Sequence, residues 1–209
     1  MNNLNKIPFH DSSLRHSTGQ AIYIDDMPEQ ENLLHGAPVL SKVACGKIKK
    51  INSDKLKNLP FFTKIITAKD IPGENEIGPI KNGEPILADD FFSYLGQPVA
   101  IVLAKTHQEA IYASSLVEIE LEFTTKPILN LDDAYEQKSF LEDPMILEKG
   151  NIKKDMSKSN YTLSGDFEIG GQDHFYLETH VAITFPGEND EYVVWSSTQH
   201  PTEVQHGVG

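Results

Sequence analysis

The stretch from Pro98 to Phe123 constrains the fold of this chain more than any other part of its sequence. It opens with PVAIVLA, a near-continuous apolar run that is typical of a strand buried on both faces. Thr106 follows, with Glu109 three residues later, which is the capping-box pattern of a helix start. VEIELEF then alternates apolar residues with glutamates, as in a strand with one face in water. This order of elements predicts a mixed α+β domain.

Neighbouring segments add short elements to this α+β unit. AIYIDDMP predicts a strand closed by an acidic turn, GAPVLSKVACGKIKKI predicts a further strand, and DKLKNLPFFTKIITAKDIP predicts a short helix followed by a strand. The stretch EIGPIKNGEPILADD is rich in Gly, Pro and Asn, so we expect turns there. Adjacent side chains on a strand point to opposite faces, so we interpret the pairs Asp25–Asp26 and Asp89–Asp90 as turn residues rather than paired carboxylates.

Composition and patterning divide the chain into four parts. Residues 1–17 have no periodicity and predict an arm, whereas 18–130 carry the α+β pattern. Residues 131–160 hold clusters of Lys, Asp and Asn and predict a connecting segment. Residues 161–209 predict a series of strands, with GEND as a hairpin loop, and we expect them to be the start of an incomplete domain.

Charge and cysteine content narrow the classes of partner. With 18 basic and 31 acidic residues, the formal net charge of -13 argues against binding to nucleic acid or to an anionic membrane. No apolar run approaches the roughly 18 residues of a membrane span, and the N-terminus does not resemble a secretory signal, so we expect a cytoplasmic protein.

Cys45, the one cysteine, cannot form an internal disulfide or an iron–sulfur site, and we expect it to be buried.

The segment Gly170–Thr179 reads GGQDHFYLET and combines polar and apolar side chains closely. Its two glycines permit close approach of a ligand or another backbone. On a strand, one face would carry a polar row of His174, Tyr176, Glu178 and His180. At about 3.3 Å per residue, His174 and Glu178 would lie roughly 13 Å apart, too far to share a zinc ion. A bulged strand whose polar groups are satisfied is the alternative that these residues leave open.

Three segments together carry a resemblance to a known family: PFHDSSLRHSTGQAIYIDDMP, FFSYLGQPVAIVLAKTHQEAIYASSLVEIELEF, and GGQDHFYLETHVAITFP with SSTQHP. They resemble the start of the molybdenum-binding subunit in the xanthine dehydrogenase and aldehyde oxidase family. The match is closest to the bacterial form, in which this subunit is a separate polypeptide. The resemblance implies an α/β-hammerhead domain at 18–130 and, from residue 161, the truncated start of the molybdopterin-binding domain.

The same resemblance assigns the residues of GGQDHFYLET. Gln172 is similar in position to the family glutamine that reaches the molybdenum centre without being a direct ligand. A neutral amide can donate a hydrogen bond to a metal oxo group without adding charge, and Gly170 and Gly171 let the loop approach the cofactor. His174 and Glu178 are implied to support that loop. The family's catalytic base lies outside these 209 residues, so the resemblance implies no catalytic residue here and an inactive chain when isolated.

The family reaction implied is oxidation of hypoxanthine and xanthine to urate, with oxygen derived from water. Electrons would pass to iron–sulfur clusters, FAD and NAD held on a partner subunit, which implies a hetero-oligomer whose substrate is a purine. Two alternatives stay open: an aldehyde oxidase-type hydroxylase subunit, and a non-catalytic acidic module for binding or assembly.

Overall fold

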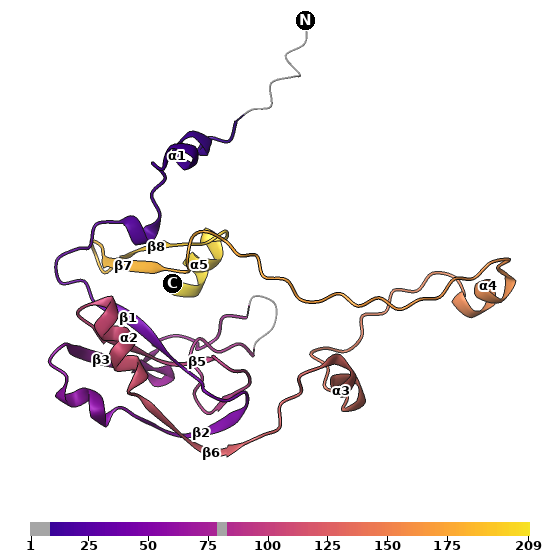
Figure 1. The fold of residues 1–209 in the computed structure, drawn as a ribbon, viewed down its shortest axis with the longest axis horizontal. Helices are drawn as coiled ribbons and strands as arrows, with labels where there is room; N and C mark the ends of the chain where they lie inside the picture. Colours follow the sequence, from indigo (N-terminus) through magenta and orange to yellow (C-terminus); the bar gives the residue numbers. More distant parts are fainter. Residues whose placement is uncertain (1–8, 79–82) are drawn as a thin grey trace, which may run out of the picture. The chain divides into compact units, whose positions relative to one another are not determined.

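The computed structural model describes residues 9–78 and 83–209, and their contacts divide into two compact units (Figure 1). One unit contains the residues up to Thr124 together with Tyr176–Gly209, and the other is Thr125–Phe175. Short strands and short helices alternate along the described chain. The predicted α+β class is therefore confirmed.

The first sheet is built around the apolar strand β5 (Pro98–Ala104). It lies between β1 (His35–Leu40) and β3 (Phe62–Thr67), and both pairings are antiparallel. As the central strand, β5 has a neighbour on each edge. The helix α2 (His107–Ser115) packs on β1 and β5. The prediction of a buried strand is confirmed by the four residues of β5 that are almost fully inaccessible to solvent, namely Val99, Ala100, Val102 and Ala104.

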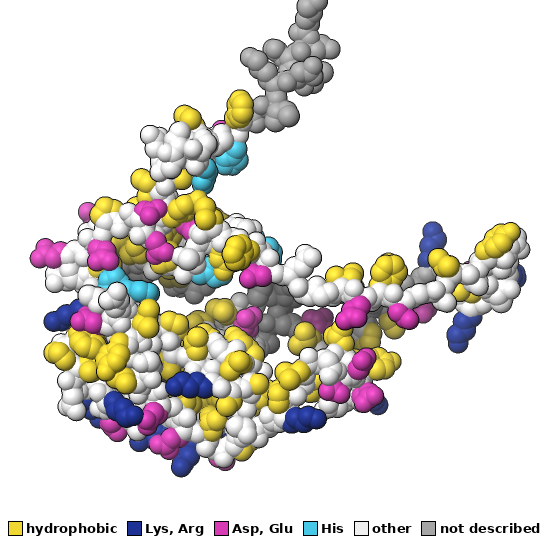
Figure 2. All heavy atoms as spheres, viewed as in Figure 1, with side chains coloured by type: hydrophobic (Ala, Val, Ile, Leu, Met, Phe, Trp, Pro, Cys, Tyr) yellow, Lys and Arg dark blue, Asp and Glu magenta, His cyan; other side chains and the backbone are white. Residues whose placement is uncertain are grey.

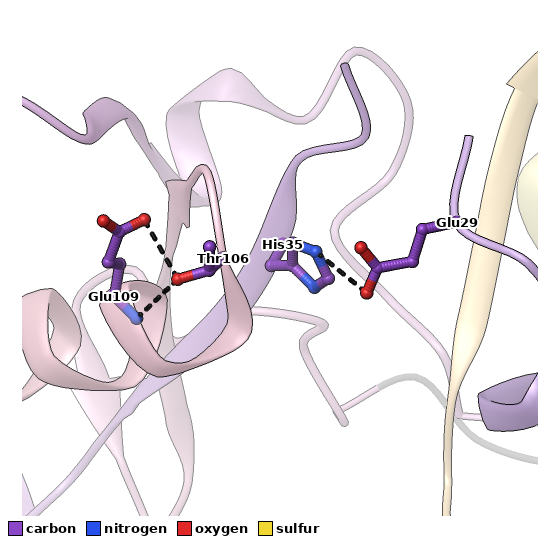
Figure 3. Close-up of polar contacts among 4 residues, drawn as sticks. All are labelled: Glu29, His35, Thr106 and Glu109. Atoms are coloured by element: carbon purple, nitrogen blue, oxygen red, sulfur yellow. Dashed lines mark hydrogen bonds and ion pairs between the residues drawn. The ribbon is translucent and has the colours of Figure 1, made fainter. Parts of the chain in front are cut away.

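Helix α2 begins where the sequence predicts it. The Thr106 hydroxyl accepts a hydrogen bond from the Glu109 backbone N–H at 3.3 Å and donates one to the Glu109 carboxylate at 3.0 Å (Figure 3). The helix then places Ala110 and Ala113 fully buried against the sheet. Their small side chains let the helix approach β5 closely, with Ala110 packed beside Ala104. The Thr106 side-chain cap thus fixes the start of the helix that covers the central strand, although the Glu109 carboxylate bonds to the Thr106 hydroxyl rather than to its backbone N–H.

A second sheet has the order β4-β2-β6, with β4 at Phe91–Phe92, β2 at Gly46–Asn52 and β6 at Glu118–Thr124. Its inner side packs Phe92 and Ile48 against Val99 of the first sheet. The predicted alternation of β6 is confirmed for Ile119 and Leu121, which are partly buried, whereas Phe123 at the end of the strand is 47% exposed.

The glutamates of β6 lie on the exposed face of the strand, where each pairs with a lysine. Lys47 Nζ lies 3.0 Å from the Glu122 carboxylate, and Lys49 Nζ lies 3.8 Å from that of Glu120. Glu118 accepts a hydrogen bond from the side chain of Lys55, which lowers the Glu118 pKa below its usual value. These pairs are largely exposed, so each contributes little stability, but together they disfavour a register that would oppose like charges.

Leu56 is part of the hydrophobic core although it lies outside the two sheets. It lies in the 3₁₀ turn η3 (Asp54–Asn58), and its side chain is completely buried in a cluster with Val39, Val102 and Val117. The strand β3 follows this turn, so the predicted order of a short helix and then a strand is confirmed.

Three predictions for residues 21–51 are wrong, and the first two concern AIYIDDMP and Cys45. AIYIDDMP is not a strand but contains the 3₁₀ turn η2 (Ile24–Asp26). The Asp26 carboxylate accepts a hydrogen bond from the Tyr23 N–H at 3.0 Å, and the Asp26 N–H donates to the Tyr23 carbonyl at 3.0 Å. A local bond of this kind competes with a strand ladder, and it confirms Asp26 as a turn residue. Cys45 is partly exposed rather than buried, with its thiol donating to the Ser93 carbonyl at 3.4 Å.

GAPVLSKVACGKIKKI forms two strands, β1 and β2, instead of one. The chain leaves β1 at Ser41, a buried serine whose hydroxyl donates to the Tyr94 carbonyl at 2.8 Å. The same hydroxyl accepts from the backbone N–H groups of Gly96 and Gln97 at 2.9 and 3.1 Å. Ser41 thereby bonds to the turn before β5 and ends the first strand.

The chain closes with a hairpin and a helix. Strands β7 (Ala182–Pro186) and β8 (Tyr192–Ser196) pair antiparallel, and α5 (Pro201–Val208) follows. The GEND loop is confirmed as the hairpin turn: Asn189 and Asp190 adopt φ values of 54° and 64°, and Gly187 N–H donates to the Glu191 carbonyl at 2.7 Å. The left-handed conformation suits these two residue types.

A short helix, α1 (Ser13–Thr18), lies near the N-terminus, in the first unit. The unit Thr125–Phe175 contains α3 (Leu131–Glu136) and α4 (Ile152–Lys158). Large apolar side chains are exposed along this unit, as the yellow side chains in Figure 2 show. Within the described residues, no helix has the length and apolar content to span a bilayer. Part of the predicted turn region, 79–82, lies outside the described residues, and its described flanks form no helix or strand before β4.

Replacing Leu56 with alanine tests the importance of the shared core. Leu56 is 0% exposed, so Leu56→Ala should lower the free energy of unfolding by about 2 to 5 kcal/mol, through lost burial and the cavity left behind. Urea unfolding of the chain measures this. Leu147→Ala is the matched control, because Leu147 is 99% exposed and should change stability by less than about 0.5 kcal/mol. Equal effects in the two variants would contradict the packing described here.

Limited proteolysis tests the contrast between the two units. Trypsin should cut first between Lys149 and Lys158, where the described residues are exposed and lack a buried core. The stretch Phe91–Phe123 should resist longest, because it carries the central strand and the capped helix. Mass spectrometry of the early fragments is the measurement, and a first cut inside Phe91–Phe123 would contradict this order.

Candidate functional site

The segment GGQDHFYLET forms neither the predicted strand nor a helix. In the described chain, 161–176 runs without regular secondary structure from α4 toward β7 (Figure 1). Phe175 adopts a φ of 48°, outside the range of regular strands, and its N–H donates to the Asp173 carboxylate at 3.3 Å. A segment with two glycines loses much backbone entropy on ordering and needs a neighbouring strand to pair with. The predicted polar row on one strand face is therefore wrong.

The glycines and Gln172 are open to solvent. A Cβ added at Gly170 or Gly171 would meet no atom within 4 Å, so packing inside the described chain does not require glycine at either position. The Gln172 side chain is exposed, and among the described residues it has no hydrogen-bond partner. The loop thus offers a free amide beside backbone that another group can approach closely.

The remaining polar residues of the stretch lie in different surroundings. The rings of Tyr176 and His180 stack, with centroids 4.7 Å apart and planes 11° apart. His174 is exposed and Glu178 is partly buried. Within residues 9–78 and 83–209, no three His, Cys, Asp or Glu side chains are grouped so that they could hold a metal ion.

The C-terminal end of the stretch is fixed by hydrogen bonds that the sequence did not indicate. The Val181 N–H donates to the Ser197 hydroxyl at 2.9 Å, and the Ser197 N–H donates to the Val181 carbonyl at 3.0 Å. This bonding extends the β7–β8 hairpin by one residue pair. Thr179 Oγ1 donates to the Asp25 carboxylate at 2.7 Å. Asp25, interpreted from sequence as a turn residue, therefore also makes a long-range contact, which no local pattern reveals.

These residues fit one part of a cofactor site. An oxygen-rich group such as a molybdenum cofactor needs hydrogen-bond donors and backbone it can approach closely, and the Gln172 amide with Gly170 and Gly171 supplies both. Two hollows on the described surface are lined by other residues, including Asn32 and Lys105 in one and Lys50 and Lys69 in the second. Gln172 lines neither of these two hollows.

The fold is that of an α/β-hammerhead domain followed by the start of a molybdopterin cofactor-binding domain. Residues 18–125 match the family model described as the a/b hammerhead domain of aldehyde oxidase and xanthine dehydrogenase, and residues 135–209 match the molybdopterin cofactor-binding domain. The chain belongs to the xanthine dehydrogenase and aldehyde oxidase family. The predicted fold, including the hammerhead, is confirmed, as is the predicted family.

Individual relatives agree with this assignment. The chain is 38% identical to xanthine dehydrogenase of Calliphora vicina over 94% of its own length and 15% of that protein. It is 36% identical to aldehyde oxidase 2 of Macaca fascicularis over 95% of its length and 14% of that protein. The structure of quinoline 2-oxidoreductase from Pseudomonas putida 86 superposes with a TM-score of 0.78 at 21% identity, covering 95% of this chain and 27% of that one, and shows the shared fold.

The chain spans about 15% of the length of the curated relatives it matches. The Calliphora vicina and Macaca fascicularis relatives are eukaryotic proteins, so the narrower resemblance to the bacterial form stays a prediction.

Ser197→Ala tests the anchor at the end of the stretch. Loss of the hydroxyl that accepts from the Val181 N–H should lower local stability there by about 1 kcal/mol. Hydrogen exchange at the Val181 amide should then speed up about fivefold. Ser164→Ala is the control, because Ser164 is exposed in the segment before the glycines. Unchanged exchange at Val181 in Ser197→Ala would contradict the assigned bond.

Proposed function

We propose that this chain works within a cytoplasmic molybdenum hydroxylase and that Gln172 directs its amide toward the molybdopterin-bound molybdenum. The observation that carries the proposal is the exposed Gln172 amide, which has no partner among the described residues and follows two glycines that pack against nothing. It lies inside the region that matches the cofactor-binding domain. Membership of the family supports the same class of reaction.

The loop residues would have distinct tasks. The bound molybdenum group would supply the oxidation chemistry. Gln172 would donate a hydrogen bond to one of its oxygens, and a neutral amide does this without changing the charge of the site. Gly170 and Gly171 would let the backbone come close. We propose His174 and Glu178 as residues that hold the loop in place, in the manner of outer-shell groups around other metal centres.

We propose a purine as the substrate, with hypoxanthine and xanthine oxidised to urate and the oxygen taken from water. The similarity to xanthine dehydrogenases supports this, although the aldehyde oxidase relative is only slightly less identical, at 36% against 38%. Electrons would leave through iron–sulfur clusters to FAD and NAD on a partner subunit, as in a hetero-oligomer of the bacterial type. Assays with xanthine and with an aldehyde in parallel separate the two substrate classes.

The domain boundaries form part of the proposal. We place the arm at 1–17, the hammerhead domain at 18–130, a connecting segment at 131–160 and the cofactor-binding portion at 161–209. The matched regions, 18–125 and 135–209, support a division between residues 125 and 135.

Gln172→Ala tests the central assignment in the enzyme that contains this chain. Loss of one preorganised hydrogen bond at a reacting centre should reduce kcat about 100-fold, or about 3 kcal/mol, while molybdenum content stays near that of wild type. Steady-state kinetics with metal analysis is the measurement. Gly171→Val should reduce both kcat and molybdenum content, because a branched side chain obstructs the approach of the backbone to the cofactor.

Gln108→Ala provides the matched control. Gln108 is an exposed glutamine on α2, outside the region matched by the cofactor-binding domain, so its loss should leave kcat unchanged. Wild-type kcat in Gln172→Ala at full molybdenum content would return the stretch to a structural role alone.

A further inference from the structure

One hydrogen bond joins two parts of the unit that are 154 residues apart in sequence. Thr179 Oγ1 donates to the Asp25 carboxylate at 2.7 Å. Thr179 is the last residue of GGQDHFYLET, within the region that matches the cofactor-binding domain, whereas Asp25 lies in the hammerhead region. The bond therefore links the two matched domains, seven residues along the chain from Gln172.

The local turn holds Asp25 in a defined position. Its neighbour Asp26 closes η2 by accepting from the Tyr23 N–H at 3.0 Å. The Tyr23 hydroxyl in turn lies 3.3 Å from His16 Nδ1. Because Asp26 satisfies the turn, the Asp25 carboxylate is left to bond outside it. Asp26 therefore bonds within the turn, whereas Asp25 bonds to Thr179, far away in sequence.

Residues on either side of Thr179 make further contacts. Tyr176 and His180 stack on each other on either side of it in sequence. Val181 is bonded to Ser197 at the open end of the hairpin. In contrast, a Cβ at Gly170 or Gly171 would contact nothing in the described chain. The stretch therefore has one fixed end, at Tyr176–Val181, and that end limits where the residues before it can reach.

We infer that Asp25 is a positioning residue for the Gln172 loop, acting through its hydrogen bond to Thr179. This inference rests on the proposed function, since it gives the hammerhead domain a part in placing a residue of the cofactor site. Both side chains are exposed, so the bond adds little to global stability. Its effect is local: it fixes the point from which the loop leaves the hairpin.

Hydrogen exchange tests the bond without any cofactor. In the 209-residue chain, Thr179→Val and Asp25→Ala should each speed exchange of the Val181 amide, which donates to the Ser197 hydroxyl, about fivefold. The double variant should exchange no faster than either single variant, because both remove the same bond. Thr179→Ser keeps the hydroxyl and should restore slow exchange. Unchanged exchange in Thr179→Val, additive effects in the double variant, or no rescue by serine would each overturn the inference.

Kinetics of the enzyme that contains the chain test the positioning role. Thr179→Val should reduce kcat about tenfold at unchanged KM, molybdenum content and melting temperature, because a misplaced hydrogen-bond donor weakens the reacting arrangement rather than substrate binding. Thr179→Ser should recover kcat. Normal kcat in Thr179→Val, with faster exchange at the Val181 amide, would overturn the positioning role.

Gln172→Ala separates this inference from the proposed function. If Gln172→Ala leaves kcat unchanged, the assignment of Gln172 fails and the positioning role fails with it, while the exchange data still decide whether the Asp25–Thr179 bond exists. If Gln172→Ala lowers kcat and Thr179→Val does not, the proposed function stands and the inference is overturned.

Discussion

Burial of the central strand β5 is the constraint on which the hammerhead region depends. The strand has neighbours on both edges and is covered by α2, while Val99 contacts the second sheet. Apolar side chains on both faces therefore leave water together, which is the dominant favourable contribution to folding. The capping bond at Thr106 and the turn containing Leu56 place the covering elements at the correct points along the chain.

The part of the chain that matters most for the proposed chemistry has no comparable core. Tyr161, Leu163, Phe167 and Ile169 alternate with polar residues, as in a strand, yet all four are at least 86% exposed. Apolar side chains gain free energy only when another surface covers them, and a strand gains its hydrogen bonds only from a neighbouring strand. The irregular conformation before β7 follows from the absence of both within the described residues.

The proposed site therefore combines an open loop with one anchored end. A Cβ at Gly170 or Gly171 would meet no atom of the described chain, whereas Thr179 and Val181 are held by hydrogen bonds. A loop of this kind orders on binding at an entropic cost, which anchoring at one end reduces. The hammerhead domain supplies part of the anchor through Asp25, so its role extends beyond packing.

The sequence by itself determined the elements whose information is local. The apolar run of β5, the Thr106 cap and the GEND turn were all predictable, because burial, capping and left-handed turn residues leave patterns within a few positions. The family resemblance pointed to Gln172, whose role stays a prediction. Only the tertiary structure decided that AIYIDDMP is a turn, and that Asp25 bonds to Thr179. A bond across 154 residues depends on how separate elements pack, and neither residue carries a local pattern that specifies the other.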